Sequence, residues 1–306
     1  MEEFPGHFGH HELPDYFFQY AFLKQLKIVL QCTCLKCSNL LIENTEDLYL
    51  KLQHKKGSHR LQEVKELVKK ATYCYNCGAP VPKIKKEVKD NGVIRIVLEQ
   101  EYTNQEMDEK TGSMTEMKQK VLEELSPKDI HDILRNMKEQ DIFLLGFNPE
   151  QSSPKDFLIK NFPIPPVIIR PTSKIDMMTA STQEDSLTLK IADIINNSNR
   201  LRKQLNKSSM ESEDVSTAAY DTAANVQYNL AVFFDNDSVK LPRSEFKTGG
   251  RPTKSVSERL KGKPGRVRNN LMGKRQDYCA RSVITGDPDV DIDESGIPLA
   301  IEKTIT

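Results

Sequence analysis

Two Cys-x-x-Cys pairs are the feature that most constrains how this chain can fold. Cys34 and Cys37 form the first pair, Cys74 and Cys77 form the second, and 36 residues separate the pairs. A Cys-x-x-Cys turn presents two thiolates to one ion, and two such turns complete a closed tetrahedral shell. We therefore expect the two segments to meet at a structural zinc site with no open position for catalysis. Four reduced, buried cysteines without a metal are the alternative.

Several classes of protein are excluded by the same sequence. Five of the six cysteines lie in two tight clusters, which favours a metal site over the disulfide framework of a secreted protein. Cys32, beside the first pair, is expected to stay outside the metal site. The N-terminus is acidic and then rich in histidine, unlike a signal peptide. No apolar run approaches the ~18–20 residues of a membrane span, so we expect no membrane partner.

A net charge of zero hides an uneven distribution of charge. Residues 240–281, called the basic segment below, contain 13 basic and three acidic residues and carry a net charge of +10. The rest of the chain contains 31 basic and 41 acidic residues and carries −10. Core-type residues such as Leu260 and Val267 interrupt the basic segment, and Gly262 and Gly265 permit turns. This pattern predicts an ordered surface that contacts phosphate groups, rather than a disordered basic tail.

Local patterns predict the elements of the first half of the chain. After a loop rich in His and Gly, aromatic and aliphatic residues predict a largely buried helix over 15–30. A second, amphipathic helix opens at Ser58, between the two cysteine pairs. An Asn-Gly pair between strand-forming residues predicts a hairpin over 82–102. The polar residues 103–119 are expected to form a mobile loop.

The second half alternates helices with extended segments. The sequence SPKD predicts a helix over 126–140, with serine as its cap and proline in its first turn. Four prolines then force an extended path, namely Pro163, Pro165, Pro166 and Pro171. Residues 172–186 are polar and expected to be exposed. Two amphipathic stretches, 187–206 and 215–233, predict an antiparallel helical hairpin.

The basic segment resembles a known family. The run GRPTKSVSERLKGKPGRVRNNLMGKRQDYCARSVITGDP is similar, nearly residue by residue, to the switch region of the largest subunit of multisubunit DNA-directed RNA polymerases of the eukaryotic and archaeal type. Upstream, PIPPVIIRP, LLGFNPE and DND resemble landmarks of the family in the right order, and PGHFGHHEL resembles its CPGHFGH signature. The resemblance spans almost the whole chain and is weakest over 38–125.

This resemblance implies an α+β fold built as the polymerase clamp, with a zinc-stapled head, the helical hairpin, small mixed sheets at the zinc module and near the switch, and no complete catalytic barrel. It divides the chain into the N-terminal part of the clamp core (1–33), the clamp head with the four-cysteine site (34–160), the extended Pro-rich segment and lid (161–186), the clamp helical hairpin (187–234), the rudder (235–258), the switch (259–288) and the start of the active-site core (289–306).

Site residues and partners follow from the resemblance as well. It implies a structural zinc on the four paired cysteines and nucleic-acid contacts by Lys254, Arg259, Lys261, Lys263, Arg266, Arg268, Lys274, Arg275 and Arg281. The implied partners are the DNA template, the RNA–DNA hybrid, the second-largest and other polymerase subunits, and elongation and initiation factors that dock on the helical hairpin. The implied location is the nucleus for a cellular eukaryotic source, and the host cytoplasm or the virion for a viral source.

The chain departs from the family at two places. Phe4 replaces the cysteine of the CPGH signature, so we expect no second zinc at His7, and His7, His10 and His11 are expected to be loop or packing residues. The catalytic NADFDGD loop, whose aspartates hold magnesium, is absent. The acidic run 287–294 lacks that motif and is expected to be a solvated loop. Magnesium would therefore act only in the complete enzyme, and this chain alone is expected to be inactive.

Three functional hypotheses remain open at this point. The first is a fragment or split-gene product of the polymerase largest subunit, from a viral or otherwise divergent source, that takes part in nucleotidyl transfer as part of the whole enzyme. The second is a free-standing nucleic-acid-binding or regulatory module derived from a polymerase clamp. The third is a zinc-stapled interaction protein that binds transcription factors through its helical hairpin.

Overall fold

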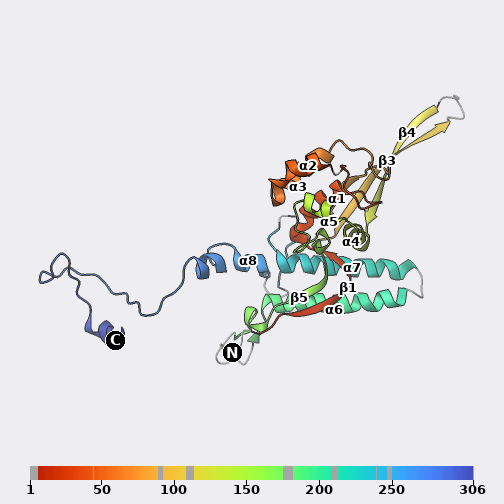
Figure 1. The fold of residues 1–306 in the computed structure, drawn as a ribbon. Coiled ribbons are helices and arrows are strands. Elements are labelled where there is room, and N and C mark those ends of the chain that lie inside the picture. The colour runs from red at the N-terminus through yellow and green to blue at the C-terminus, as the bar shows by residue number, and fades with distance from the viewer. Residues whose placement is uncertain are drawn as a thin grey trace. The chain divides into compact units, whose positions relative to one another are not determined.

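The computed structural model describes residues 6–43, 45–88, 92–107, 114–174, 182–208, 213–238, 240–246 and 250–305. It divides into two compact units, Met1–Glu258 and Arg259–Thr306. The first unit combines helices with small antiparallel sheets, and the hairpin of β3 (Ile94–Met107) and β4 (Met114–Leu125) projects beyond the helices, which confirms the mixed α and β fold (Figure 1). The sheets of the described residues contain two, three and two strands, and none closes into a barrel.

The first sheet joins the start of the chain to its middle. β1 (Gly9–Phe18) pairs antiparallel with β5 (Leu158–Ile164). The side chain of Gln227 accepts a hydrogen bond from the Phe18 amide and donates one to the Phe18 carbonyl, so it holds the end of β1.

The helix predicted over 15–30 is therefore wrong in its first part. Asp15–Phe18 belongs to β1, a 3-10 turn follows at η1 (Tyr20–Phe22), and α1 (Leu23–Cys32) begins only there. The backbone of β1 finds its partners more than a hundred residues away, and a run of aromatic and aliphatic residues suits a buried strand as well as a buried helix.

Two helices lie between the cysteine pairs. α2 (Glu46–Gln53) has no counterpart among the predicted elements, whereas α3 (Gly57–Val68) confirms the helix expected from Ser58. The buried Arg60 joins them to α5 (Glu139–Leu144). Its guanidinium lies 4.3 Å from the centre of the Phe143 ring and donates to three backbone carbonyls, those of Gln53, Lys55 and Phe143.

The second sheet has the order β2-β3-β4, formed by β2 (Lys83–Val88), β3 (Ile94–Met107) and β4 (Met114–Leu125). The predicted hairpin is confirmed, although its turn residues 89–91 lie outside the described part. Gly92 needs to be glycine because its φ is +82° and an added Cβ would lie 2.6 Å from Cδ2 of the Tyr228 ring.

The loop predicted over 103–119 is wrong. Residues 103–107 of β3 pair with 114–118 of β4 in an unbroken antiparallel register, which runs from Met107↔Met114 to Ile96↔Leu125. This polar stretch lacks the alternation of apolar residues that reveals a half-buried strand, and its pairing depends on backbone hydrogen bonds that leave no pattern in the sequence. The tip, residues 108–113, lies outside the described residues.

The helix predicted over 126–140 is confirmed at its start and wrong at its end. α4 (Pro127–Arg135) begins as expected, because Ser126 Oγ accepts a hydrogen bond from the Asp129 amide at 3.1 Å. The helix is interrupted at Asn136–Lys138, and a second helix, α5, begins at Glu139. Both helices bury apolar residues in the same core. The interruption changes the direction of the chain, so that the second helix can also face that core.

The Pro-rich segment follows an extended path, as expected, apart from one short turn. η2 (Pro154–Phe157) precedes it, β5 leads into it and η3 (Val167–Ile169) lies within it. A small two-stranded pair then joins β6 (Ser173–Lys174) to β7 (Thr182–Gln183), and residues 175–181 between them lie outside the described residues.

The helical hairpin is confirmed. It consists of α6 (Ser186–Ser208) and α7 (Glu213–Phe234), which lie side by side in Figure 1. Lys190 Nζ near the start of α6 donates to Asn229 Oδ1 near the end of α7 at 3.3 Å, as an antiparallel pair requires. Within the amphipathic stretch 187–206, Leu189 and Leu205 are each 40% exposed, so not every leucine of that stretch lies on the packed face.

A single asparagine organises the chain after α7. Asn236 Nδ2 donates to the Ser244 and Thr253 carbonyls at 3.0 and 2.7 Å, and its Oδ1 accepts from the Ser244 amide at 2.8 Å. Asn236 therefore closes the base of the loop whose ends meet at the bridge Glu245↔Pro252.

The remaining elements are α8 (Val256–Leu260), a π-type turn η4 (Val267–Leu271) and α9 (Leu299–Ile305). The sheet expected near residues 259–288 is not found, since the described residues after 235 form no strand and only the bridge at Glu245. Across the described ranges, no helix combines the length and the apolar composition that a membrane crossing needs.

We predict that Asn236→Ala destabilises this region by about 2–3 kcal/mol, because the buried Ser244 amide and Thr253 carbonyl lose their hydrogen bonds to the side chain. Urea denaturation measures the loss, and hydrogen exchange at Ser244 should become faster. Asn161→Ala, at an exposed asparagine of β5, is the control and should change neither quantity. Unchanged exchange at Ser244 would contradict the role of Asn236.

Candidate metal centre and basic segment

The two Cys-x-x-Cys pairs form matching knuckles. In the first, the Cys34 amide donates to the Asn39 carbonyl, and the Ser38 amide donates to the Cys34 carbonyl. In the second, the Cys74 amide donates to the Ala79 carbonyl, and the Gly78 amide donates to the Cys74 carbonyl. The fourth residue after each first cysteine has a positive φ, +58° at Ser38 and +67° at Gly78. Each turn is therefore tight enough to aim both of its sulfurs in one direction.

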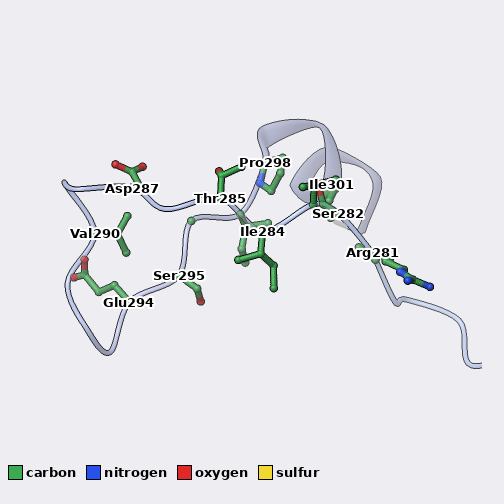
Figure 2. Close-up of a pocket in the computed structure, with 14 residues that line it drawn as sticks. Arg281, Ser282, Ile284, Thr285, Asp287, Val290, Glu294, Ser295, Pro298 and Ile301 are labelled. Carbon is green, nitrogen blue, oxygen red and sulfur yellow. The ribbon is translucent and has the colours of Figure 1, made fainter.

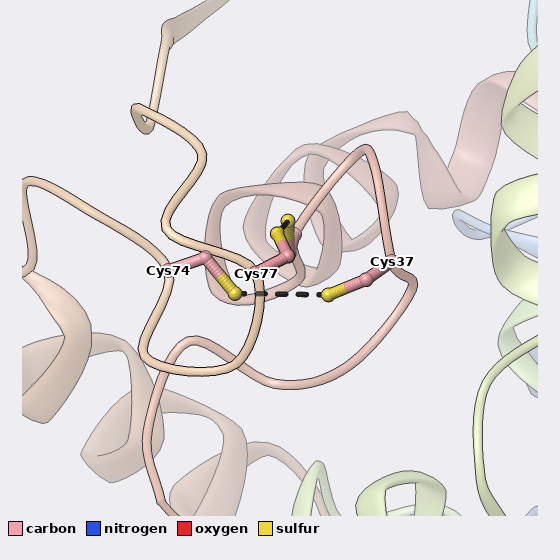
Figure 3. A group of neighbouring side chains, drawn as sticks. Cys37, Cys74 and Cys77 are labelled. Atoms are coloured by element: carbon pink, nitrogen blue, oxygen red, sulfur yellow. Dashed lines mark hydrogen bonds between the residues drawn. The ribbon is translucent and has the colours of Figure 1, made fainter.

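The structure brings all four sulfurs together, although the pairs are far apart in the sequence. Cys34 Sγ lies 3.5 Å from Cys77 Sγ, and Cys37 Sγ lies 3.6 Å from Cys74 Sγ (Figure 3). All four lie within 4.8 Å of one another. Four thiolates at 2.3 Å from a tetrahedral zinc are about 3.8 Å apart, and a disulfide would need about 2.0 Å. The donor set and its spacing fit zinc.

Electrostatics within the cluster favour a cation. Burial raises the pKa of the Cys34 thiol to about 12, although the backbone amides of Cys37 and Lys36 favour its thiolate. Burial also opposes ionisation of Cys37, but the Asn39 amide, the Asn76 side chain and the neighbouring sulfurs outweigh it and lower its pKa to about 6. Four thiolates this close repel one another, and a divalent cation at their centre removes that repulsion.

Two neighbouring residues define the surroundings of the cluster. Cys32 is fully buried in the core, and burial raises its pKa to about 12, so it remains an un-ionised packing residue outside the four-sulfur group, as expected. Asp141 of α5 accepts a hydrogen bond from the Leu40 amide at 3.3 Å, which ties the first knuckle to α5. Burial raises the pKa of Asp141, while the Leu40 amide and Lys138 act in the opposite direction.

The N-terminal histidines show no convergence on a common point. His11 Nε2 lies 3.0 Å from Ser198 Oγ and so packs β1 against α6, as expected for a packing residue. His10 is an exposed residue of β1, and His7 is exposed before it. Among the described residues, the four cysteines form the one group whose donor atoms could surround a metal ion.

The nine basic residues expected to contact nucleic acid lie within one stretch of the chain, residues 254–281. Lys254 belongs to the first unit, and the other eight belong to the second. Arg259 is half-buried, and the side chains of the others are exposed. Arg266 Nη1 donates to Asn270 Oδ1 at 3.0 Å, one turn further along. The arrangement is a string of accessible cations, suited to an extended polyanion rather than to a small ligand.

A hollow of about 800 Å³ lies within the second unit, where residues 280–301 fold back on themselves (Figure 2). Asp287 and Glu294 lie on the loop at one side of it, and Arg281 points away at the other. Ile284, which also lines the hollow, is 97% exposed. Because its walls are exposed chain and its charged groups do not converge, we assign no chemistry to this hollow.

Three positioning residues were missed in the sequence. Asn236 and Asp141 act on backbone groups that are distant in the chain, and no local pattern announces such contacts. Ser38 could have been found, because it stands in the first knuckle where Gly78 stands in the second. Aligning the two knuckles would have predicted its positive φ.

The comparisons with known proteins match the chain to one family along almost its whole length. The family description "RNA polymerase Rpb1, domain 1" matches residues 1–271, and "RNA polymerase Rpb1, domain 2" matches residues 273–306. The chain is 38% identical over 307 residues to "DNA-directed RNA polymerase subunit 1" of Acanthamoeba polyphaga mimivirus, covering 99% of this chain and 20% of that protein. It is 36% identical over 310 residues to "DNA-directed RNA polymerase subunit Rpo1N" of Sulfolobus acidocaldarius, covering 99% of this chain and 32% of that protein.

The chain thus spans a third or less of the length of these curated relatives. The two family matches follow one another along it with a single residue between them. The chain therefore belongs to the RNA polymerase Rpb1 family and corresponds to the N-terminal part of the polymerase largest subunit.

Proposed function

We propose that this chain forms the clamp, lid, rudder and switch of a DNA-directed RNA polymerase and holds the DNA template and the RNA–DNA hybrid during transcription. The observation that carries the proposal is the set of eight exposed basic residues between Lys254 and Arg281, which lie within the matches to the Rpb1 family. The clamp head would comprise residues 34–160, the helical hairpin 187–234, the rudder 235–258 and the switch 259–288.

The chemistry of the basic segment suits this role. Lys and Arg bind phosphate strongly but read no base sequence, and a polymerase must hold any sequence that it transcribes. Neighbouring glycines such as Gly262, with a φ of +84°, let the backbone turn between successive cations. The role of the chain would be to hold nucleic acid, and nucleotidyl transfer with its magnesium would be supplied by the complete enzyme.

The second unit supports assembly with other polymerase subunits over a free-standing module. Many of its large apolar side chains are exposed to solvent. Each of the following has an exposed fraction of 63% or more: Leu271, Met272, Val283, Ile284, Ile292, Ile297 and Leu299. A protein that functions alone rarely exposes so many large apolar side chains over one segment. The second-largest subunit and the remainder of the largest subunit would cover them in the assembled enzyme.

The four-cysteine cluster would hold a structural zinc. All four positions are protein thiolates, so no position is left for water or substrate. The ion would join the start of the clamp head to the strand-rich part that follows Cys77, and would neutralise the repulsion among the sulfurs. Elongation and initiation factors would dock on the helical hairpin, as the family resemblance implies.

We predict that Cys77→Ser lowers bound zinc from about one ion per chain to nearly none, because three thiolates and a hydroxyl hold zinc far more weakly. Metal analysis of the purified protein by mass spectrometry measures this change. Cys279→Ser, at an exposed cysteine outside the cluster, is the matched control and should keep its zinc. Wild-type protein that is purified without chelators and contains no zinc would contradict the assignment.

Charge reversal tests the basic segment. We expect Lys261→Glu, Arg266→Glu and Arg268→Glu, combined in one variant, to weaken binding of a labelled single-stranded oligonucleotide at least ~tenfold. The slope of log affinity against log salt should become shallower by about 2, since each phosphate contact on a single strand contributes about 0.7. Fluorescence anisotropy at several salt concentrations measures both quantities.

A matched control carries the same change of charge in the first unit, away from the basic segment. Lys128, Lys155 and Lys203 are exposed lysines on α4, η2 and α6, and their combined reversal to Glu should change affinity less than twofold. Equal affinities of the two variants would count against the proposed role of the basic segment. Co-purification of the chain with a second-largest polymerase subunit tests the assembly. If the two proteins do not co-purify from cells that express both, a free-standing module is favoured.

A further inference from the structure

Four lysines of the first unit converge from three separate parts of the chain. Lys24 and Lys27 lie three residues apart on α1 and therefore share one face of that helix. Their neighbours Leu23 and Leu26 are buried in the main core. The packing of these leucines fixes the rotation of α1 and so the direction in which its two lysines extend.

Lys86 joins this face from β2. It lies two residues after the buried Ile84, so both side chains are on the face of the sheet that packs on α1. Its neighbour Lys85 is on the opposite face, where Lys85 Nζ lies 2.6 Å from Glu99 Oε2. The strand thus separates one paired lysine from one directed at α1.

Lys240 joins the cluster from the segment that follows α7. Three contacts hold this segment against the core beside α1 and β2. The hydroxyl groups of Tyr20 and Ser238 lie 2.6 Å apart, Leu241 is buried in the same core as Leu26 and Ile84, and Tyr228 donates to the Pro242 carbonyl. Lys240 therefore has a fixed place although it is exposed.

The cluster has no internal counter-charge in the described part of the chain. None of the four lysines forms an ion pair there, and the nearby Asp237 pairs with Arg243. Partial burial lowers the pKa of Lys86, and the charges of Lys240, Lys27 and Lys24 lower it further. Gathering four cations is unfavourable, and here it occurs in a chain whose residues outside the basic segment include 41 acidic side chains that could have been placed beside them.

We propose that this lysine cluster, Lys24, Lys27, Lys86 and Lys240, is a second phosphate-binding surface that contacts the backbone of bound nucleic acid. The inference rests on the proposed function, because Lys240 is the first residue of the basic segment and makes the cluster continuous with it. Ammonium groups act as point charges that accept a phosphate from many directions, so four of them suit a flexible polyanion. Within the first unit, the phosphate-binding surface would thereby include α1 and β2 beside the start of the basic segment.

Neutralising variants of the full chain test the cluster. Lys24→Gln, Lys27→Gln and Lys86→Gln are combined and compared with the matched variant that carries Gln at Lys128, Lys155 and Lys203. We expect the cluster variant to bind a single-stranded RNA or a DNA duplex about fivefold or more weakly, with a salt slope shallower by at least about 1. The matched variant should bind within twofold of wild type. The two probes distinguish a single strand from a duplex as the natural source of the phosphates.

Lysine acetylation of the wild-type chain provides a second readout that does not depend on a substitution. Bound oligonucleotide should protect Lys24, Lys27 and Lys86 from acetylation at least threefold and leave Lys128 and Lys203 unprotected. Equal binding by the two Gln variants, or no protection, would overturn the proposal. Protection by polyglutamate but not by oligonucleotide would assign the surface to an acidic protein and overturn it as well. If the basic-segment variant binds the oligonucleotide more weakly and the cluster variant binds it as tightly as wild type, the proposed function stands and only this inference is refuted.

Discussion

The meeting of two cysteine knuckles is the constraint on which the head of this structure depends. It fixes residues 34–37 against residues 74–77 and so closes a loop that contains α2 and α3. Both helices are short, and neither would persist alone in water. Their packing requires the loop to be closed, and Arg60 then locks them to α5 through three backbone carbonyls. A contact among four sulfur atoms thereby closes the segment that carries both helices.

Elements with local signals were predicted from the sequence, and elements that depend on distant partners were not. Ser126 with Pro127 marks the start of α4, and the apolar stripes of α6 and α7 announce the hairpin, because each signal lies within a few residues. β1 was mistaken for part of a helix, since its partner β5 and its anchor Gln227 are far away in the chain. The outer parts of β3 and β4 were missed because backbone pairing between polar residues leaves no periodic pattern.

The candidate sites follow the same rule. The metal cluster was found from spacing alone, because a Cys-x-x-Cys turn is its own local unit. The basic segment was found because its 13 basic residues are concentrated within one stretch of the sequence, residues 240–281. The lysine cluster was not found, since Lys24 and Lys27 lie in an apolar helix and Lys86 lies in a strand of mixed charge, and they meet only through the packing of α1 on β2. Binding surfaces assembled from several elements are therefore the functional features that are hardest to predict from a single sequence.

The closure of one loop by Asn236 has a consequence for how this protein can change over evolutionary time. Its amide spans the base of the loop between Ser244 and Thr253, so the backbone on either side is held in place whatever lies between. Insertions between the backbone-paired Phe246 and Arg251 would then be tolerated by the fold, because the cost of closing a loop rises only slowly with its length. A variant with a longer or shorter loop is therefore expected to keep its fold as long as Asn236 is retained.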